Sequence, residues 1–262
     1  MQIALLVNGR IVTVELPPAI HLLLMGETGS GKSTFAKTFP KPELVWFWDP
    51  LGKDMPYLKG AKSVGKMIEF QYGKYRDVEH ADGLIRLEYY HDGSPYQPDA
   101  YSKYLERMGN FHKEYESWQT IVADSATFME LSGRKWHQYV LNPTAKDARQ
   151  WYGGSKELLE EMLMMRFAGL PMNVVVLTHI DEDKDELYGE IVRNPAVPGK
   201  LSKRLGSAFG EHYRMMVVRN EKGDLEHMVQ TKNNGVYAAQ SQINAPDPAF
   251  PHYLSLWENY KR

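Results

Sequence analysis

Short apolar runs, each long enough for one buried strand, recur along the chain and are separated by segments with helical periodicity. The runs occupy residues 20–25, 43–49, 120–127 and 173–179. Between them, Lys32 to Phe39 predicts a helix that Pro40 ends, and Lys156 to Phe167 carries apolar residues at helical spacing. This alternation of strands and helices is typical of a parallel sheet with helices packed on its faces.

Both ends of the chain have the pattern of antiparallel strands instead. Near the start, two apolar runs flank Asn8-Gly9, a pair that favours a two-residue hairpin turn. Near the end, residues 213–220 and 225–232 predict a second hairpin. We therefore predict an α/β fold with a mainly parallel sheet flanked by helices, antiparallel strands at its C-terminal edge and an N-terminal β-hairpin.

The pattern divides the chain into a hairpin extension, a core and a tail, at residues 1–19, 20–240 and 241–262. Inside the core, residues 50–117 form the least regular part, an insertion rich in Gly, Tyr, Lys and Asp. We expect this insertion to contain one strand at residues 83–90 and one helix at residues 99–116.

Composition excludes several kinds of protein. Hydrophobic residues make up 43% of the chain and charged residues 24%, which is ordinary for a protein that buries a core. The chain has no cysteine, so disulfide bonds and thiolate zinc sites are excluded. The formal net charge of −2 gives no overall positive field, although a local basic stripe would not show in that total. With no apolar span of about 20 residues and no signal-peptide pattern, we expect a cytoplasmic protein without a membrane partner.

One loop has a sequence that specifies phosphate binding. Residues 26–33 fit G-x-x-x-x-G-K-[ST] in every required position, between a predicted strand and a predicted helix. Glycines let the backbone turn its N–H groups toward phosphate oxygens, and the helix adds its positive N-terminal end. Lys32 would reach the β- and γ-phosphates of ATP, and the Ser33 hydroxyl would bind Mg²⁺. The predicted ATP-binding residues are Gly26, Glu27, Thr28, Gly29, Ser30, Gly31, Lys32, Ser33 and Thr34, the last near the α-phosphate.

Two strand ends supply acids that catalysis would need near this loop. Asp124 would complete the Mg²⁺ shell with Ser33, or would only cap the following helix. Asp49, which closes "LVWFWD", would emerge at the same sheet edge and orient a water molecule, or would only shape a turn. Asp54 and Glu27 are further candidates for the water-orienting role.

A third strand end carries polar groups rather than acids. The run "VVVLTH" ends in Thr178 and His179, where a strand tip would face the γ-phosphate. We expect His179 to sense that phosphate, and the alternative is an ordinary histidine at a strand end.

The order of these motifs resembles that of a known family. The chain resembles the short RecA-like ATPases encoded by bacteriophages. The resemblance lies in the loop, the strand ending at Asp49, "VADS" with Asp124, "VVVLTH" and the later segment "NPAVPGKLSKRLGSAFGEHYRM". These ATPases are also described as AAA-type phage nucleotide-binding proteins. The resemblance covers roughly residues 20–240, and its more specific part is the Pro-Gly-Lys-Leu segment after "LTH".

This resemblance implies a RecA-type ATPase core that binds single-stranded DNA in phage recombination, annealing or replication, in the host cytoplasm. It also implies a homo-oligomeric ring or filament with ATP between subunits, and a single-strand-binding protein as a further candidate partner. Basic residues of the neighbouring subunit would reach the γ-phosphate, and Lys200, Lys203 and Arg204 match this role. Their alternative is a solvated helix face with i, i+3 and i+4 spacing.

The chain departs from the RecA pattern at one position. RecA-like enzymes carry a catalytic glutamate two residues after the aspartate of the second strand, and the corresponding residue here is Leu51. Either Asp49 or Asp54 replaces that glutamate, or hydrolysis is slow and the nucleotide acts mainly as a switch. Three functions follow: a DNA-stimulated ATPase, a P-loop kinase with a small-molecule acceptor, or a nucleotide-gated assembly protein with little turnover.

Two segments combine aromatic and basic residues, as sites for single-stranded DNA do. Residues 70–108 interleave tyrosines with basic residues but carry almost as many acids. Residues 144–154 contain Lys146, Arg149 and Trp151 and lie where RecA-like proteins keep mobile DNA-binding loops. We favour the second segment.

Overall fold

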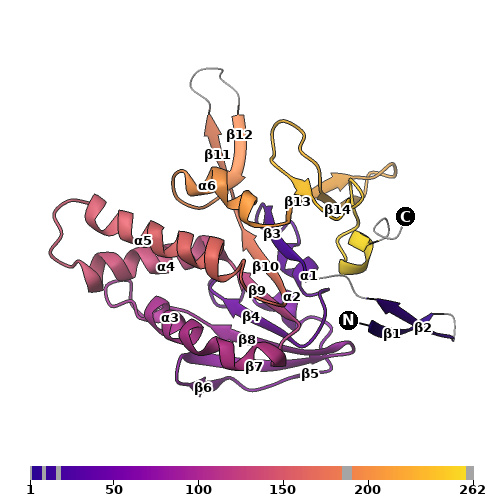
Figure 1. Ribbon diagram of the computed structural model, residues 1–262, viewed down its shortest axis with the longest axis horizontal. Helices are drawn as coiled ribbons and strands as arrows, with labels where there is room; N and C mark the ends of the chain where they lie inside the picture. The colour runs from indigo at the N-terminus through magenta and orange to yellow at the C-terminus, as the bar shows by residue number, and fades with distance from the viewer. Residues whose placement is uncertain (1, 8–9, 16–18, 185–190, 258–262) are drawn as a thin grey trace.

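An 11-stranded sheet forms the centre of the protein (Figure 1). The computed structural model describes residues 2–7, 10–15, 19–184 and 191–257. The six parallel strands of the sheet are β3 (His21–Gly26), β4 (Glu43–Phe47), β8 (Gly83–Tyr89), β9 (Thr120–Asp124), β10 (Asn173–Thr178) and β13 (Glu211–Arg219). The antiparallel additions are β5 (Ser63–Val64), β6 (Ile68–Phe70), β7 (Gly73–His80), β14 (Leu225–Gln230) and β15 (Gln240–Ser241). The order is β14-β13-β3-β10-β9-β4-β8-β7-β5, with β15 beside β13 and β6 beside β7.

Helices cover both faces of this sheet. They are α1 (Lys32–Ala36), α2 (Met55–Leu58), α3 (Ala100–Asn110), α4 (Ala126–Trp136), α5 (Arg149–Glu161) and α6 (Leu201–Arg204). Short helical segments also occur at residues 111–117, 137–141, 162–166, 205–208 and 253–257. Helices α3, α4 and α5 contribute to one hydrophobic core, and Figure 1 shows them together beside the sheet. Helices α1 and α2 contribute to the other core.

The central strands are buried on both faces, which explains why the sequence shows them as continuous apolar runs. In β3, Leu23 belongs to the core under α3, α4 and α5, whereas Leu22 and Leu24 belong to the core under α1 and α2. In β4, Trp46 stacks on Phe167 with 5.5 Å between the ring centroids. The predicted α/β fold class, with its mainly parallel sheet and antiparallel C-terminal edge, is confirmed.

The N-terminal hairpin is also confirmed. Strands β1 (Gln2–Val7) and β2 (Arg10–Glu15) pair antiparallel as a separate two-stranded sheet. The predicted turn at Asn8-Gly9 lies outside the described residues. The predicted tail is described as far as residue 257, and the ring of Tyr253 packs 4.9 Å from that of Phe39, so this part of the tail belongs to the core. The segment boundaries themselves remain predictions.

A further hairpin has no counterpart in the sequence prediction. Strands β11 (Ile180–Lys184) and β12 (Ile191–Pro195) pair antiparallel directly after β10 and project from the sheet in Figure 1. Their charged residues lack the apolar alternation that reveals a half-buried strand.

Within the described parts of the chain, no helix combines the length and apolarity needed to cross a membrane.

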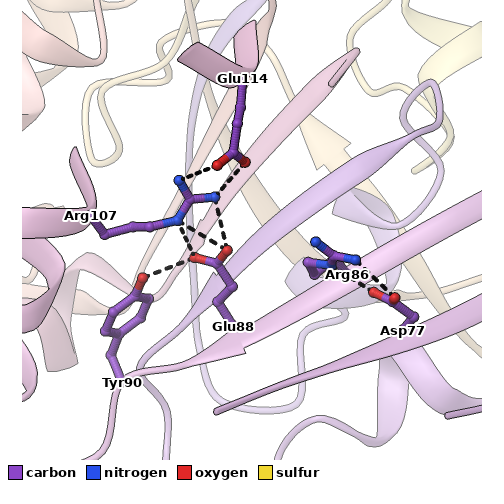
Figure 2. Close-up of polar contacts among 6 residues, drawn as sticks. All are labelled: Asp77, Arg86, Glu88, Tyr90, Arg107 and Glu114. Carbon is purple, nitrogen blue, oxygen red and sulfur yellow. Dashed lines mark hydrogen bonds and ion pairs between the residues drawn. The ribbon is translucent and has the colours of Figure 1, made fainter. Parts of the chain in front are cut away.

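Residues 50–117 are more regular than the sequence predicts. The expected strand is β8 and the expected helix is α3 with the helical turn after it, but α2, β5, β6 and β7 also form here. Strands β7 and β8 make a hairpin that extends the sheet. The segment looks irregular in sequence because its polar side chains pair across the sheet edge. Arg86 on β8, for example, bonds Asp77 on β7 at 2.7 Å (Figure 2).

A buried ion pair fastens α3 to this extension. Arg107 Nη2 on α3 lies 3.0 Å from Glu88 Oε1 on β8 and 2.8 Å from Glu114 Oε2 (Figure 2). The Tyr90 hydroxyl donates to Glu88 Oε2 at 2.9 Å. The side chains of Arg107 and Glu88 are 3% and 2% exposed, so each charge depends on its partner in the absence of water.

Four tyrosines of residues 70–108 pack in the protein interior. Tyr89, Tyr90, Tyr101 and Tyr104 are buried, and Tyr90 and Tyr104 contact Trp48 at ring-centroid distances of 5.0 Å each. Their rings are therefore not available to stack on bases. These four tyrosines therefore cannot contribute to a DNA-binding surface at residues 70–108, whereas Tyr96 is 68% exposed and DNA contact at this segment remains a prediction.

Candidate functional site

The phosphate-loop motif connects the end of β3 to the start of α1, and its glycines answer specific steric demands. A Cβ atom on Gly26 would lie 2.6 Å from Ser30 Oγ and 3.0 Å from Met215 Cβ, closer than side chains tolerate. Gly29 and Gly31 have φ angles of +79° and +97°, in the left-handed region that favours glycine. Steric space at Gly26 and backbone conformation at Gly29 and Gly31 therefore favour glycine along this loop.

Lys32 folds back over the loop that precedes it. Its Nζ atom donates to Gly26 O at 2.7 Å and to Glu27 O at 2.9 Å. Burial lowers the pKa of this lysine, and the negative charges of Asp124, Asp49 and Glu27 oppose that effect. The ammonium group is therefore held beside the loop, among carboxylates.

A cavity of about 500 Å³ lies against the loop and collects most of the predicted site residues. Predicted residues that line it are Thr28, Gly29, Gly31, Lys32, Ser33, Thr34, Asp49, Asp124 and His179. Lys53, Met55, Pro56 and Phe128 contribute to its walls as well. Of the other loop residues, Glu27 is exposed and Ser30 is buried behind the loop. Residues from four strand ends thus meet in one hollow.

Asp124 ends β9 directly beside the loop. Its Oδ2 atom accepts a hydrogen bond from Ser33 Oγ at 2.7 Å and another from the Tyr57 hydroxyl at 2.8 Å. Burial, with the nearby charge of Asp49, raises the pKa of Asp124 to about 6. Tyr57 is fully buried on α2. No local sequence pattern marks it as a site residue, because its contact with Asp124 joins residues far apart in the chain.

Asp49 is the second carboxylate of the cavity. It is half-buried after β4, and its Oδ1 atom accepts a hydrogen bond from Ser125 Oγ at 2.6 Å. Asp54, the alternative candidate, is buried and accepts a hydrogen bond from the Tyr89 hydroxyl at 2.7 Å, and it does not line the cavity. Leu51, at the position of the RecA glutamate, is 71% exposed. The structure thus brings Asp49, but neither of the other two, to the loop.

His179 follows β10 at the edge of the cavity. Its backbone N–H donates to Thr127 Oγ1 at 3.1 Å, and its ring lies edge-on to Phe128 with 6.0 Å between centroids. Burial lowers the pKa of His179, and the charge of Lys32 lowers it further. A neutral imidazole beside the loop follows from these two effects.

Lys200 and Lys203 do not lie in the phosphate cavity of their own chain. With Arg204, they line a second hollow of about 640 Å³, which Asp181 and Glu182 also line. Arg204 also forms an ion pair with Glu160. The contact expected of these lysines is one between subunits, and it remains a prediction.

The chain matches one known protein family. Residues 19–242 match the family model described as AAA domain. A comparison with curated proteins finds no match. Among solved structures, the chain is similar to the flagellar accessory protein FlaH from Methanocaldococcus jannaschii, with 10% identity over 86% of this chain and 84% of that chain and a TM-score of 0.41. It is also similar to a prototypical ATPase of the type III secretion system of pathogenic bacteria, with 11% identity over 79% of this chain and 53% of that chain and a TM-score of 0.46.

The family match spans the loop, both cavity carboxylates and His179. It therefore includes every strand end from which the cavity is built. The chain belongs to the AAA-domain family, and its phosphate loop makes it a P-loop nucleotide-binding protein.

Proposed function

We propose that this protein is a Mg²⁺-dependent ATPase that acts on single-stranded DNA. The observation that carries the ATPase part is the meeting of Lys32, Ser33, Asp124 and Asp49 in one cavity at the phosphate loop. Phosphoryl transfer to water requires a cation that binds phosphate, oxygen ligands for a metal ion and a carboxylate that can orient the water. These residues supply all three kinds of group.

Lys32 and the loop backbone would bind the β- and γ-phosphates, and Thr34 at the start of α1 would contact the α-phosphate. Ser33 Oγ and Asp124 Oδ2 lie 2.7 Å apart, and hydroxyl and carboxylate oxygens are the ligands that Mg²⁺ prefers, so the pair fits this metal. When bound there, Mg²⁺ neutralises charge on the phosphates.

Asp49 would orient the attacking water. It lines the cavity beside Asp124, and the bond from Ser125 holds one of its oxygens while the other can accept from a water molecule. His179, which also lines the cavity, would contact the γ-phosphate as a neutral donor. Exposed Leu51 cannot do what a glutamate does at that position, so hydrolysis depends on Asp49.

The DNA part rests on the resemblance and on one surface. Lys146, Arg149 and Tyr152 are exposed between residues 144 and 154, where the chain enters α5. Cations and aromatic rings together are the groups that bind single strands. The proposal also includes assembly into a homo-oligomer that acts in phage recombination. In that assembly Lys200 or Lys203 would reach the γ-phosphate bound by the neighbouring subunit. A single-strand-binding protein would be a further partner.

The test is ATP hydrolysis with and without single-stranded DNA, with Lys32→Ala as the blank. DNA stimulation that Lys32→Ala abolishes supports the proposal. Turnover that DNA does not change removes the DNA part and favours a kinase, for which small-molecule acceptors would be screened. Assembly that depends on nucleotide but occurs without ATP hydrolysis would identify a nucleotide-gated assembly protein.

A further inference from the structure

The β13–β14 hairpin supports the phosphate loop from behind. Met215 on β13 pairs with Gly26 on β3, and His227 on β14 reaches the loop from the next strand. A Cβ atom on Gly31 would lie 3.2 Å from His227 Nδ1 and 3.3 Å from Met215 Cε. The imidazole therefore packs directly against the loop backbone.

His227 also makes a hydrogen bond to the loop. Its Nδ1 atom lies 2.7 Å from the carbonyl oxygen of Ser30. A carbonyl oxygen can only accept, so Nδ1 carries the hydrogen and donates it. This bond joins residues 197 positions apart, and no local sequence pattern reports it.

The bond fixes the orientation of one peptide group. The Ser30–Gly31 peptide is trans, so its C=O and N–H point in opposite directions. Because the carbonyl of Ser30 points to His227, the N–H of Gly31 points away from it, and Gly31 lines the phosphate cavity. We propose that His227 is a positioning residue that holds this peptide so that the Gly31 N–H faces a bound polyphosphate. The inference rests on the proposed nucleotide site.

A loop with glycines at positions 29 and 31 needs such a support. Glycine permits rotations that other residues resist, and a rotated Ser30–Gly31 peptide would present an oxygen to the phosphates instead of a donor. A bond from outside the loop selects the donor orientation before the ligand arrives, which reduces the ordering cost of binding.

The experiment compares four proteins: the unaltered chain, His227→Ala, His227→Gln and His112→Ala. Glutamine retains an N–H donor. His112 is a matched control, because it is exposed and its Nδ1 also lies near a backbone carbonyl, that of Gly109 at 3.1 Å, away from the cavity. Calorimetric titrations with ATP and with pyrophosphate report binding, and melting temperatures without ligand report the fold.

We expect His227→Ala to weaken both ligands by about tenfold, as the loss of one phosphate-directed donor would, with an unchanged melting temperature. His227→Gln should recover part of the loss, and His112→Ala should match the unaltered chain. Unchanged affinity in His227→Ala overturns the inference. If the unaltered chain binds pyrophosphate but not ATP, the ATPase proposal fails while the role of His227 is still decided by pyrophosphate. Binding of neither ligand overturns both.

Discussion

The hydroxyl of Tyr57 donates a hydrogen bond to Asp124 Oδ2 over 2.8 Å, and the same oxygen accepts from Ser33. Two donors on one carboxylate oxygen fix the plane of the carboxylate beside the loop. They also favour its charged form, against the effect of burial and of Asp49.

Tyr57→Phe should weaken the response to Mg²⁺. The ring and its packing against Phe47 remain, but the carboxylate of Asp124 loses one of its two donors. We expect the Mg²⁺ concentration for half-maximal ATP hydrolysis to rise by about threefold to tenfold, equivalent to one hydrogen bond. A Mg²⁺ titration at saturating ATP checks this. An unchanged Mg²⁺ response would show that Ser33 alone positions the carboxylate.

Asp124→Asn should stabilise the fold near neutral pH while it weakens nucleotide binding. The pKa of Asp124 is raised to about 6, so the folded protein keeps a proton that the unfolded chain releases at lower pH. The free energy of unfolding therefore falls between about pH 4 and about pH 6, by up to about 3 kcal/mol, and stays reduced above that range. The Asp124→Asn variant has no carboxyl group at this position, so its free energy of unfolding does not fall for this reason.

Melting temperatures without Mg²⁺ or nucleotide, at pH 5 and at pH 7.5, measure the effect. The variant should melt higher than the unaltered protein at pH 7.5, by several degrees, and the gap should narrow at pH 5. Glu43, whose pKa burial raises to about 7, changes stability in the same direction but is present in both proteins. If Asp124→Asn melts lower than the unaltered protein at pH 7.5, the raised pKa of Asp124 is contradicted.

Asp49→Asn should separate binding from turnover. The amide retains the size of the side chain and an acceptor for Ser125 but cannot take a proton from water. We expect the turnover number to fall by about 100-fold or more, with ATP affinity changed only slightly. Asp54→Asn is the control, because Asp54 accepts a hydrogen bond from Tyr89 and does not line the cavity. This substitution should change the stability of the fold rather than the turnover number. Equal turnover in Asp49→Asn would remove the water-orienting role.

Arg107→Met should destabilise the fold far more than Arg86→Met. Loss of Arg107 leaves Glu88 buried without its partner, which costs about 3–5 kcal/mol. Arg86 and Asp77 are 30% and 38% exposed, so water replaces the lost bond and the cost is about 1 kcal/mol or less (Figure 2). Chemical denaturation of the two variants compares these values. Similar losses would mean that water reaches Glu88.

The loop and the acids at the strand ends could be predicted from sequence because their signals are local. A glycine pattern between a strand and a helix specifies the loop, and parallel strands deliver Asp49 and Asp124 to one edge. The contacts of Tyr57 and His227 could not, because they join distant segments and depend on how the sheet is ordered.

The sheet extension was hidden for a different reason. Strand β7 reads as polar because Asp77 and its neighbours pair with side chains on β8, and such pairs leave no apolar alternation. The same holds for Glu88, which looks like a surface residue in sequence and is buried only because Arg107 arrives from α3.

The placement of β3 has a consequence for synthesis of the chain on the ribosome. Leu22 pairs with Val175 on one side and with Glu211 on the other, so the strand that carries the loop waits for two partners translated much later. Domains tend to fold as units once their parts have emerged. We therefore expect nucleotide to act as a folding ligand only after translation has passed β13, and a nascent chain halted earlier to gain no stability from ATP.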